Sequence, residues 1–191
     1  MADRPAPAAA ERPGRYQRSP RGMLVALVVV VFAVAGFVGL RGLGRDSGAV
    51  PVQTVDYHGW VKSGRDDGKL LTLAPRQLPK GWRATSVDYA TGTDPRWHLG
   101  VLTDQGRYIG LEESWASAAQ MVQQYVDQNA SRGKAVTIAG RHWQVWTDPG
   151  GDYAVVDTRP SPVRRHPETV LVVGDADPSV IRRFAGSLSA H

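Results

Sequence analysis

An uncharged run near the start of the chain most constrains how it folds. Met23 to Leu40 gives 18 consecutive residues, all of them apolar or glycine. As a helix rising about 1.5 Å per residue, this run covers most of a hydrocarbon layer about 30 Å thick. A buried core helix would carry a polar stripe, and the run has none. The sequence therefore predicts one transmembrane helix over 23–40, in contact with the membrane lipid bilayer.

The arginines around this run predict its orientation. Five of them lie in the 22 residues before it, and only Arg41 and Arg45 follow it closely. The positive-inside rule then places the N-terminus in the cytoplasm and everything after the run outside. The alternative is a cleavable signal peptide, because Ala33-Val34-Ala35 has the small-x-small form of a cleavage site. Both alternatives export the rest of the chain, and the first describes a single-pass cell-membrane protein.

Composition divides the rest of the chain into three parts. Residues 1–22 are rich in Ala, Pro and Arg, which predicts a disordered basic tail in the cytoplasm. Residues 41–56 contain Gly48 and Pro51 and are interpreted as a spacer. Residues 57–191 have the length of one ordinary domain, which we expect to be extracytoplasmic.

The net charge of the chain belongs to its N-terminal part. The chain carries 23 Lys and Arg against 18 Asp and Glu, a formal net charge of +5. Residues 1–45 hold seven arginines and two acids, which accounts for the whole excess. The exported domain is therefore neutral, and the basic pI does not support nucleic-acid binding. With no cysteine in the chain, disulfides, thiolate metal sites and a cysteine nucleophile are excluded.

The exported domain has the pattern of short strands and two main helices. Glycine-containing turns at 104–106 and 139–140 predict two β-hairpins. The continuous apolar run 169–173 predicts a central strand. Segment 70–73 is predicted to be extended, and residues 57–70 are compatible with a short helix ending near Gly64 or Gly68. The predicted strands are 82–89, 96–103, 107–113, 134–138, 141–147, 152–158 and 169–173.

Two segments have the apolar period of a helix. In 115–129 apolar residues recur at three- and four-residue steps, and Ser117 with Gln120 fits a capping box. The second helix begins at Asp177-Pro178, an N-cap residue followed by proline in the first turn. The sum is an α+β domain whose antiparallel sheet of about six or seven strands is packed by two main helices.

The sequence contains none of the common enzyme or metal motifs. No zinc-binding histidine spacing, G-x-S-x-G turn or phosphate-binding glycine loop occurs. We therefore assign no catalytic residue, metal ligand or cofactor from the sequence.

One cluster of titratable residues does follow from the hairpin at 104–106. A two-residue loop would place His98 across from Glu113, and a three-residue loop would place it across from Glu112. The two glutamates point to opposite faces, because they are adjacent on a strand. The simpler interpretation is an exposed cross-strand ion pair, and the alternative is a catalytic pair.

Tryptophan is the other candidate for ligand contact. All six tryptophans follow the apolar run. Exposed rings of Trp97, Trp143 or Trp146 would stack on a glycan or anchor a partner protein. The alternative is that they fill the core in place of phenylalanine.

Four segments resemble a known family. They are 78–86 (LPKGWRATS), 97–100 (WHLG), 108–112 (YIGLE) and 140–143 (GRHW), which in this order look like the actinobacterial domain-of-unknown-function family 4245. The resemblance implies a membrane-anchored protein and brings no activity, ligand or catalytic residue. The L-P-x-G-W lead into a strand also looks distantly like the Mog1/PsbP type of fold, which hosts binding and assembly roles.

These observations lead to one hypothesis and two alternatives. We expect a non-enzymatic binding or assembly module of unknown ligand, with an envelope protein or glycan as possible partner. The first alternative is a cell-envelope hydrolase of unrecognised type that uses His98 with Glu112 or Glu113. The second is a cell-wall glycan-binding module that uses the tryptophans.

Overall fold

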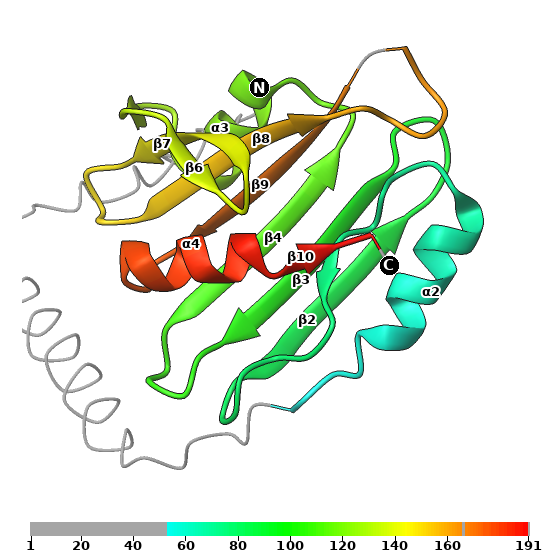
Figure 1. Ribbon diagram of the computed structural model, residues 1–191, viewed down its shortest axis with the longest axis horizontal. Coiled ribbons are helices and arrows are strands. Elements are labelled where there is room, and N and C mark those ends of the chain that lie inside the picture. Colours follow the sequence, from blue (N-terminus) through cyan, green and yellow to red (C-terminus); the bar gives the residue numbers. More distant parts are fainter. Residues whose placement is uncertain (1–52, 166, 191) are drawn as a thin grey trace, which may run out of the picture. The chain divides into compact units, whose positions relative to one another are not determined.

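The computed structural model describes residues 53–165 and 167–190 (Figure 1). The predicted tail 1–22, the predicted membrane segment 23–40 and residues 41–52 of the predicted spacer 41–56 lie outside the described residues. Within these residues no helix is long and apolar enough to cross a membrane. The domain begins by residue 55, because the Val55 N–H donates to the Ala84 carbonyl at 2.9 Å.

A large antiparallel sheet forms the centre of the domain, as predicted. Its order is β2-β3-β4-β9-β8-β7-β5, and β6 also pairs with β7. The strands are β2 (Arg83–Ala90), β3 (Arg96–Leu102), β4 (Tyr108–Ser114), β5 (Ser131–Arg132), β6 (Val136–Ile138), β7 (Arg141–Thr147), β8 (Tyr153–Arg159) and β9 (Glu168–Gly174). The predicted strand 134–138 is β6, and β5 just before it brings the sheet to eight strands. A separate two-stranded ladder joins β1 (Ala74–Pro75) to β10 (Leu188–Ser189).

Strand β9 is central because both of its faces are apolar. Every residue of β9 is buried, and the strand pairs with β4 on one side and β8 on the other. Val170 and Val172 belong to the cluster on one face of the sheet, while Leu171 and Val173 belong to the cluster on the other. The sheet therefore has packed layers on both sides at this strand.

Helices cover the two faces of the sheet. On one face, α4 (Pro178–Gly186) packs Ile181 and Phe184 against β8 and β9, and in Figure 1 it lies in front of the sheet. On the other face, α3 (Ala118–Tyr125) packs Met121 and Val122 against the same two strands.

The α3 helix confirms the predicted capping box but is shorter than predicted. Ser117 accepts a hydrogen bond from the Gln120 N–H, and the Gln120 side chain accepts one from the Ser117 N–H. The helix ends at Tyr125 instead of reaching 129, because the Asp127 carboxylate accepts the Asn129 N–H at 2.6 Å. This local bond offers the backbone an alternative to the helix.

A third helix, α2 (His58–Asp67), lies where the sequence only allowed a short helix. It ends at Gly68, whose φ of 69° places it in the left-handed region and whose N–H donates to the Gly64 carbonyl. Only Val61 and Gly64 of the helix are buried, which explains the weak apolar pattern. Gly64 lies against Thr72 and Tyr89, so a side chain there would collide with both.

Two buried glutamates hold the segment after α2. Segment 70–73 is not a strand, contrary to expectation, and Thr72 has a φ of 49°. Its backbone is satisfied by side chains: the Leu71 N–H donates to Glu168, and the Leu73 N–H donates to Glu113 Oε1 at 2.6 Å. Trp97 Nε1 in turn donates to the Leu73 carbonyl at 2.8 Å. Side chains of the sheet thus supply the backbone hydrogen bonds that a neighbouring strand would otherwise supply to this segment.

Burial of these two carboxyls raises their pKa values. Burial, reinforced by the charge of Glu168, raises the pKa of Glu113 to about 8. Burial raises the pKa of Glu168 to about 7, although the Leu71 N–H and the charge of Arg159 act in the opposite direction. Both carboxyls bind protons more tightly in the folded chain than in the unfolded chain, where they titrate near 4.5.

The protein is therefore predicted to lose stability as the pH rises. The stabilising contribution of the two glutamates is complete below about pH 4.5 and is lost as the pH rises through their folded pKa values. We expect the unfolding temperature to fall by about 4 °C or more between about pH 5 and about pH 9, because one unit of pKa shift is worth about 1.4 kcal/mol. Thermal melts of the purified protein measure this.

Glu113→Gln should flatten this pH dependence, because glutamine keeps an oxygen for the Leu73 N–H and does not ionise. The matched control is Asp66→Asn, which changes an exposed carboxylate on α2 that pairs with Lys62. The control should keep the wild-type slope. An equally steep slope in Glu113→Gln would contradict the role given to Glu113.

Candidate functional site

The loop between β3 and β4 decides which glutamate faces His98. The Thr103 N–H donates to the Arg107 carbonyl at 2.8 Å, and the Gly106 N–H donates to the Thr103 carbonyl at 3.0 Å. Gly106 has a φ of 73°, which completes a three-residue loop. The register therefore pairs His98 with Glu112 and Trp97 with Glu113. Glu112 lies on the face of His98, and Glu113 lies in the core.

A β-bulge in β2 brings a serine to the same face. Ala84 pairs with Val101, but Ser86 pairs with Gly100, so the ladder shifts by one residue at Thr85. In a regular strand Ser86 would share the core face of Ala84. The bulge instead turns Ser86 to the opposite face, where Asp88 and His98 also lie.

Ser86, His98 and Glu112 form a continuous hydrogen-bonded chain, which we call the relay. Ser86 Oγ lies 2.8 Å from His98 Nε2, and His98 Nδ1 lies 2.6 Å from Glu112 Oε1. Glu112 is nearly buried, with 8% of its side chain exposed, whereas 27% of the His98 side chain is exposed. The outer end of the relay is thus accessible, while its carboxylate is shielded.

Two glycines make room for the relay and for Tyr108 beside it. Gly100 and Gly110 are cross-strand partners. A Cβ on Gly100 would collide with Ser86 Oγ and would lie 2.9 Å from the Tyr108 hydroxyl. A Cβ on Gly110 would lie 3.2 Å from that same hydroxyl. The side chains of Ser86 and Tyr108 therefore lie together over the two glycines, which have no side chains of their own.

The electrostatics of the relay favour a charged imidazole. The hydrogen bond to Glu112 raises the pKa of His98, and the charges of Glu112 and Asp88 add to this against the effect of burial. Burial raises the pKa of Glu112, although its bond with His98 and the charge of Arg96 oppose the rise. Above the pKa of His98 the imidazole is neutral, and its Nδ1–H donates to the carboxylate while Nε2 accepts from Ser86.

The other predicted site residues lie elsewhere. Glu113 is fully buried on the core face and cannot meet a ligand. Trp97 and Trp143 are 0% and 1% exposed, so these two rings fill the core and do not contact a ligand at the surface, which is the second of the two interpretations that the sequence left open. Trp146 is partly buried and lines a cavity of about 440 Å³ beside Ala118 and Ala119 of α3.

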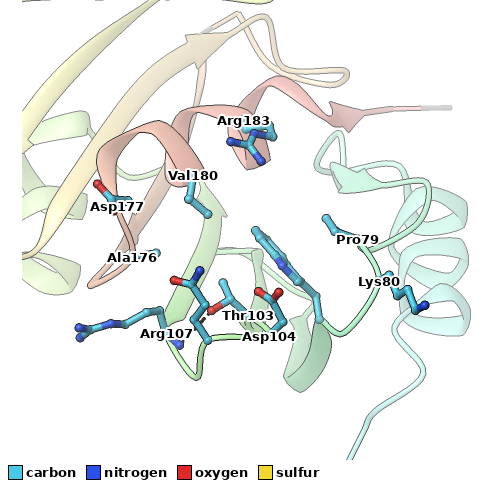
Figure 2. Close-up of a pocket in the computed structure, with 11 residues that line it drawn as sticks. Pro79, Lys80, Thr103, Asp104, Arg107, Ala176, Asp177, Val180 and Arg183 are labelled. Atoms are coloured by element: carbon cyan, nitrogen blue, oxygen red, sulfur yellow. Dashed lines mark hydrogen bonds between the residues drawn. The ribbon is translucent and has the colours of Figure 1, made fainter.

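A separate cleft lies on the other face of the sheet, where α4 packs. It has a volume of about 300 Å³ and is lined by Trp82 together with polar side chains from three segments. Figure 2 shows Pro79 and Lys80 on one side, Asp104 and Arg107 from the β3–β4 hairpin, and Val180 and Arg183 from α4. Trp82 was not among the ligand contacts that the sequence indicated, although it leads the strand of the L-P-x-G-W motif.

The tight packing of Gly81 positions this cleft. Gly81 has a φ of 85°, and a Cβ there would lie 2.9 Å from the Asp104 Cβ. Only glycine lets the 79–82 loop approach the hairpin this closely. The Trp82 ring stacks on Phe184 of α4, with ring centroids 6.3 Å apart. The 79–82 loop, the β3–β4 hairpin and helix α4 therefore each form one wall of the cleft.

Residues 15–188 match the model of a family described as "Protein of unknown function (DUF4245)". The chain belongs to the DUF4245 family. This confirms the resemblance that the four motifs indicated. Three of those motifs supply Trp82, Ser86, His98, Tyr108 and Glu112, so the family pattern and the two candidate sites share residues. No curated protein matches this DUF4245 chain.

Two solved structures are distantly similar to this DUF4245 protein. One is the complex of Pseudomonas aeruginosa MucA/MucB, and the other is MucB in complex with MucA(peri). Each is 15% identical at a TM-score of 0.36, and the match covers 61% of this chain. It spans about a third of those chains, 34% and 35%. A likeness this distant carries no functional information, and the Mog1/PsbP analogy stays a prediction.

The relay makes a prediction about the titration of His98. Glu112→Gln should lower the pKa of His98, because burial remains while the carboxylate that favours the imidazolium is gone. Asp88→Asn, the matched control on the neighbouring strand, should lower it less, since Asp88 acts only through its charge. NMR titration of the histidine ring signals measures both. Equal pKa values for His98 in the wild type and Glu112→Gln would contradict the relay.

Proposed function

We propose that this DUF4245 protein is a single-pass membrane protein that presents a glycan-binding domain on the outer face of the cell membrane. The observation that carries the proposal is the Trp82 cleft, which combines a half-buried indole with several polar side chains that pair with no residue in 53–165 or 167–190. Segment 23–40 would supply the anchor, and the cleft would bind pyranose units of an envelope glycan. This proposal replaces the tryptophans named in the sequence analysis with Trp82.

The indole of Trp82 supports the stacking part of the proposal. The ring is partly exposed to the cleft and is supported from behind by Phe184. Carbon-bound hydrogens of a pyranose present an apolar face that packs on such a ring by dispersion. A ring held by a neighbouring aromatic loses little conformational entropy on binding.

The rim of the cleft supports the recognition of hydroxyl groups. Four charged side chains of the rim make no side-chain hydrogen bond or ion pair with other residues in 53–165 or 167–190: Lys80, Asp104, Asp177 and Arg183. They offer both donors and acceptors, and a sugar hydroxyl both donates and accepts. The cleft volume of about 300 Å³ lies at the lower end of the range for small-ligand sites.

The cavity beside Trp146 is less suited to a polar ligand. Its polar side chains are already engaged within the protein: Asp157 pairs with Arg141 and Arg159, and Gln144 donates to the Gly133 carbonyl. A ligand there would have to displace these bonds, whereas Lys80, Asp104 and Arg183 of the Trp82 cleft pair with no other residue in 53–165 or 167–190.

The glycan proposal predicts that Trp82→Ala weakens binding of soluble cell-wall fragments at least about tenfold, which corresponds to about 1.4 kcal/mol. Calorimetric titration of the purified protein measures this. The matched control is Trp60→Ala, which removes an exposed tryptophan on α2 that does not line this cleft. Gln105→Ala changes the exposed hairpin tip without touching Phe184 and should weaken binding by a smaller factor. Loss of binding in Trp60→Ala but not in Trp82→Ala would contradict the proposal.

The membrane topology is tested by single-cysteine labelling, because the chain has no native cysteine. We expect a membrane-impermeant maleimide to label Ser63→Cys on intact cells, since Ser63 is exposed on α2. Ser19→Cys in the N-terminal tail should react only after the cells are permeabilised. Labelling of Ser19→Cys on intact cells would contradict the proposed orientation.

A further inference from the structure

The relay has the atomic arrangement of an activated serine nucleophile. Its serine oxygen bonds to Nε2 of a histidine whose Nδ1 bonds to a shielded carboxylate. This is the order nucleophile, base and orienting group that serine hydrolases use on unrelated folds. Both hydrogen bonds are within the reach required of such groups, at 2.8 and 2.6 Å.

We propose that Ser86 is the nucleophile of an acyl-ester hydrolase site on the sheet face opposite the Trp82 cleft. His98 acts as general base, and Glu112 is a positioning residue that orients the imidazole. The inference does not depend on the proposed glycan binding, because the two sites share no residue and lie on different faces.

Access supports this assignment. Ser86 and His98 are both partly exposed, and Tyr108 beside them is 39% exposed. The bulge at Thr85 is what presents Ser86 to solvent instead of to the core. Bulges of this kind are frequent next to active sites, where they redirect a side chain.

Tyr108 supplies the group that stabilises the developing charge. Its hydroxyl lies over the same two glycines as the Ser86 side chain, because a Cβ on Gly100 would meet both Ser86 Oγ and the Tyr108 hydroxyl. When Ser86 Oγ attacks an ester carbonyl carbon, the former carbonyl oxygen becomes the oxyanion, two bonds away from Oγ. A tyrosine hydroxyl at this position can donate to it.

The reaction balances with water as the second substrate. Ser86 Oγ bonds to the carbonyl carbon, and its proton moves to His98 Nε2. The carbon–oxygen bond to the leaving alcohol then breaks, and the alcohol takes that proton. Water attacks the acyl-serine in the same way, gives its proton to His98 Nε2, and releases the acid while Ser86 recovers the proton. The net change is ester plus water to acid plus alcohol.

The test is covalent labelling of the purified full-length protein with a fluorophosphonate probe. Attack of Ser86 Oγ on phosphorus expels fluoride and leaves a stable adduct, which peptide mass spectrometry locates between Arg83 and Arg96. We expect one adduct, at Ser86, and no labelling in Ser86→Ala. His98→Gln should slow the reaction at least about 100-fold. The matched control Ser63→Ala, which removes an exposed serine on α2, should label at the wild-type rate.

The pH profile separates catalysis from a structural role. The labelling rate should rise with pH as His98 loses its proton, in the environment set by Asp88, Arg96, Tyr108, Glu112 and Tyr125. Glu112→Gln should shift this profile to lower pH, and Tyr108→Phe should slow hydrolysis of p-nitrophenyl acetate at least about tenfold.

Two results would overturn the inference. The first is labelling of Ser86 at the same slow rate as Ser63. The second is a labelling rate that His98→Gln leaves unchanged while its unfolding temperature stays at the wild-type value.

Discussion

The register of the β3–β4 hairpin is the constraint on which the rest of the domain depends. Its three-residue loop pairs His98 with Glu112 and directs Glu113 into the core. A slip of one residue would move every side chain of β4 to the other face. Glu112 would then lie in the core, Glu113 would face His98, and the Leu73 N–H would lose its acceptor. One turn thereby sets both the relay and the attachment of the segment after α2.

The adjacent residues Glu112 and Glu113 have different roles because their side chains lie in different surroundings. Both carboxyls are removed from water, but Glu112 has a cation-forming partner in His98, whereas Glu113 has a second buried carboxyl, Glu168, nearby. Burial of a charge without an opposite charge is costly, so Glu113 and Glu168 hold protons at neutral pH more readily than ordinary glutamates. They still accept backbone N–H groups, and this lets an irregular segment pack against Trp97 without a strand ladder.

Much of the fold was predictable because local chemistry agrees with the tertiary structure. The turn glycines, the Ser117 capping box and the Asp177-Pro178 helix start are short-range signals, and the structure confirms each element that they predicted. The apolar run 169–173 identified the central strand for the same reason. Helix α2 escaped prediction because only two of its residues are buried, so its position depends on close contact between Gly64 and Thr72.

The candidate sites were predictable only in part. The pair of His98 with a glutamate followed from loop length, but the choice of Glu112 required the loop conformation. Ser86 was out of reach, because strand alternation places it on the core face and only the bulge at Thr85 reverses this. For Trp97 and Trp143 the sequence left core filling and ligand contact both open, since a tryptophan on a strand has the same pattern in the core as at the surface, and the structure places both rings in the core. Trp82 depends on the approach of Gly81 to the hairpin, a long-range contact without a local signal.

The hydrogen bond between His98 Nδ1 and Glu112 Oε1 is the most direct test of this account. At 2.6 Å it should give a histidine N–H proton signal far downfield of the amide region in the NMR spectrum. We predict that the signal is present in the wild type and in Glu113→Gln and is absent in Glu112→Gln. A signal lost in Glu113→Gln but kept in Glu112→Gln would contradict the register, and with it both the relay and the buried glutamate attachment.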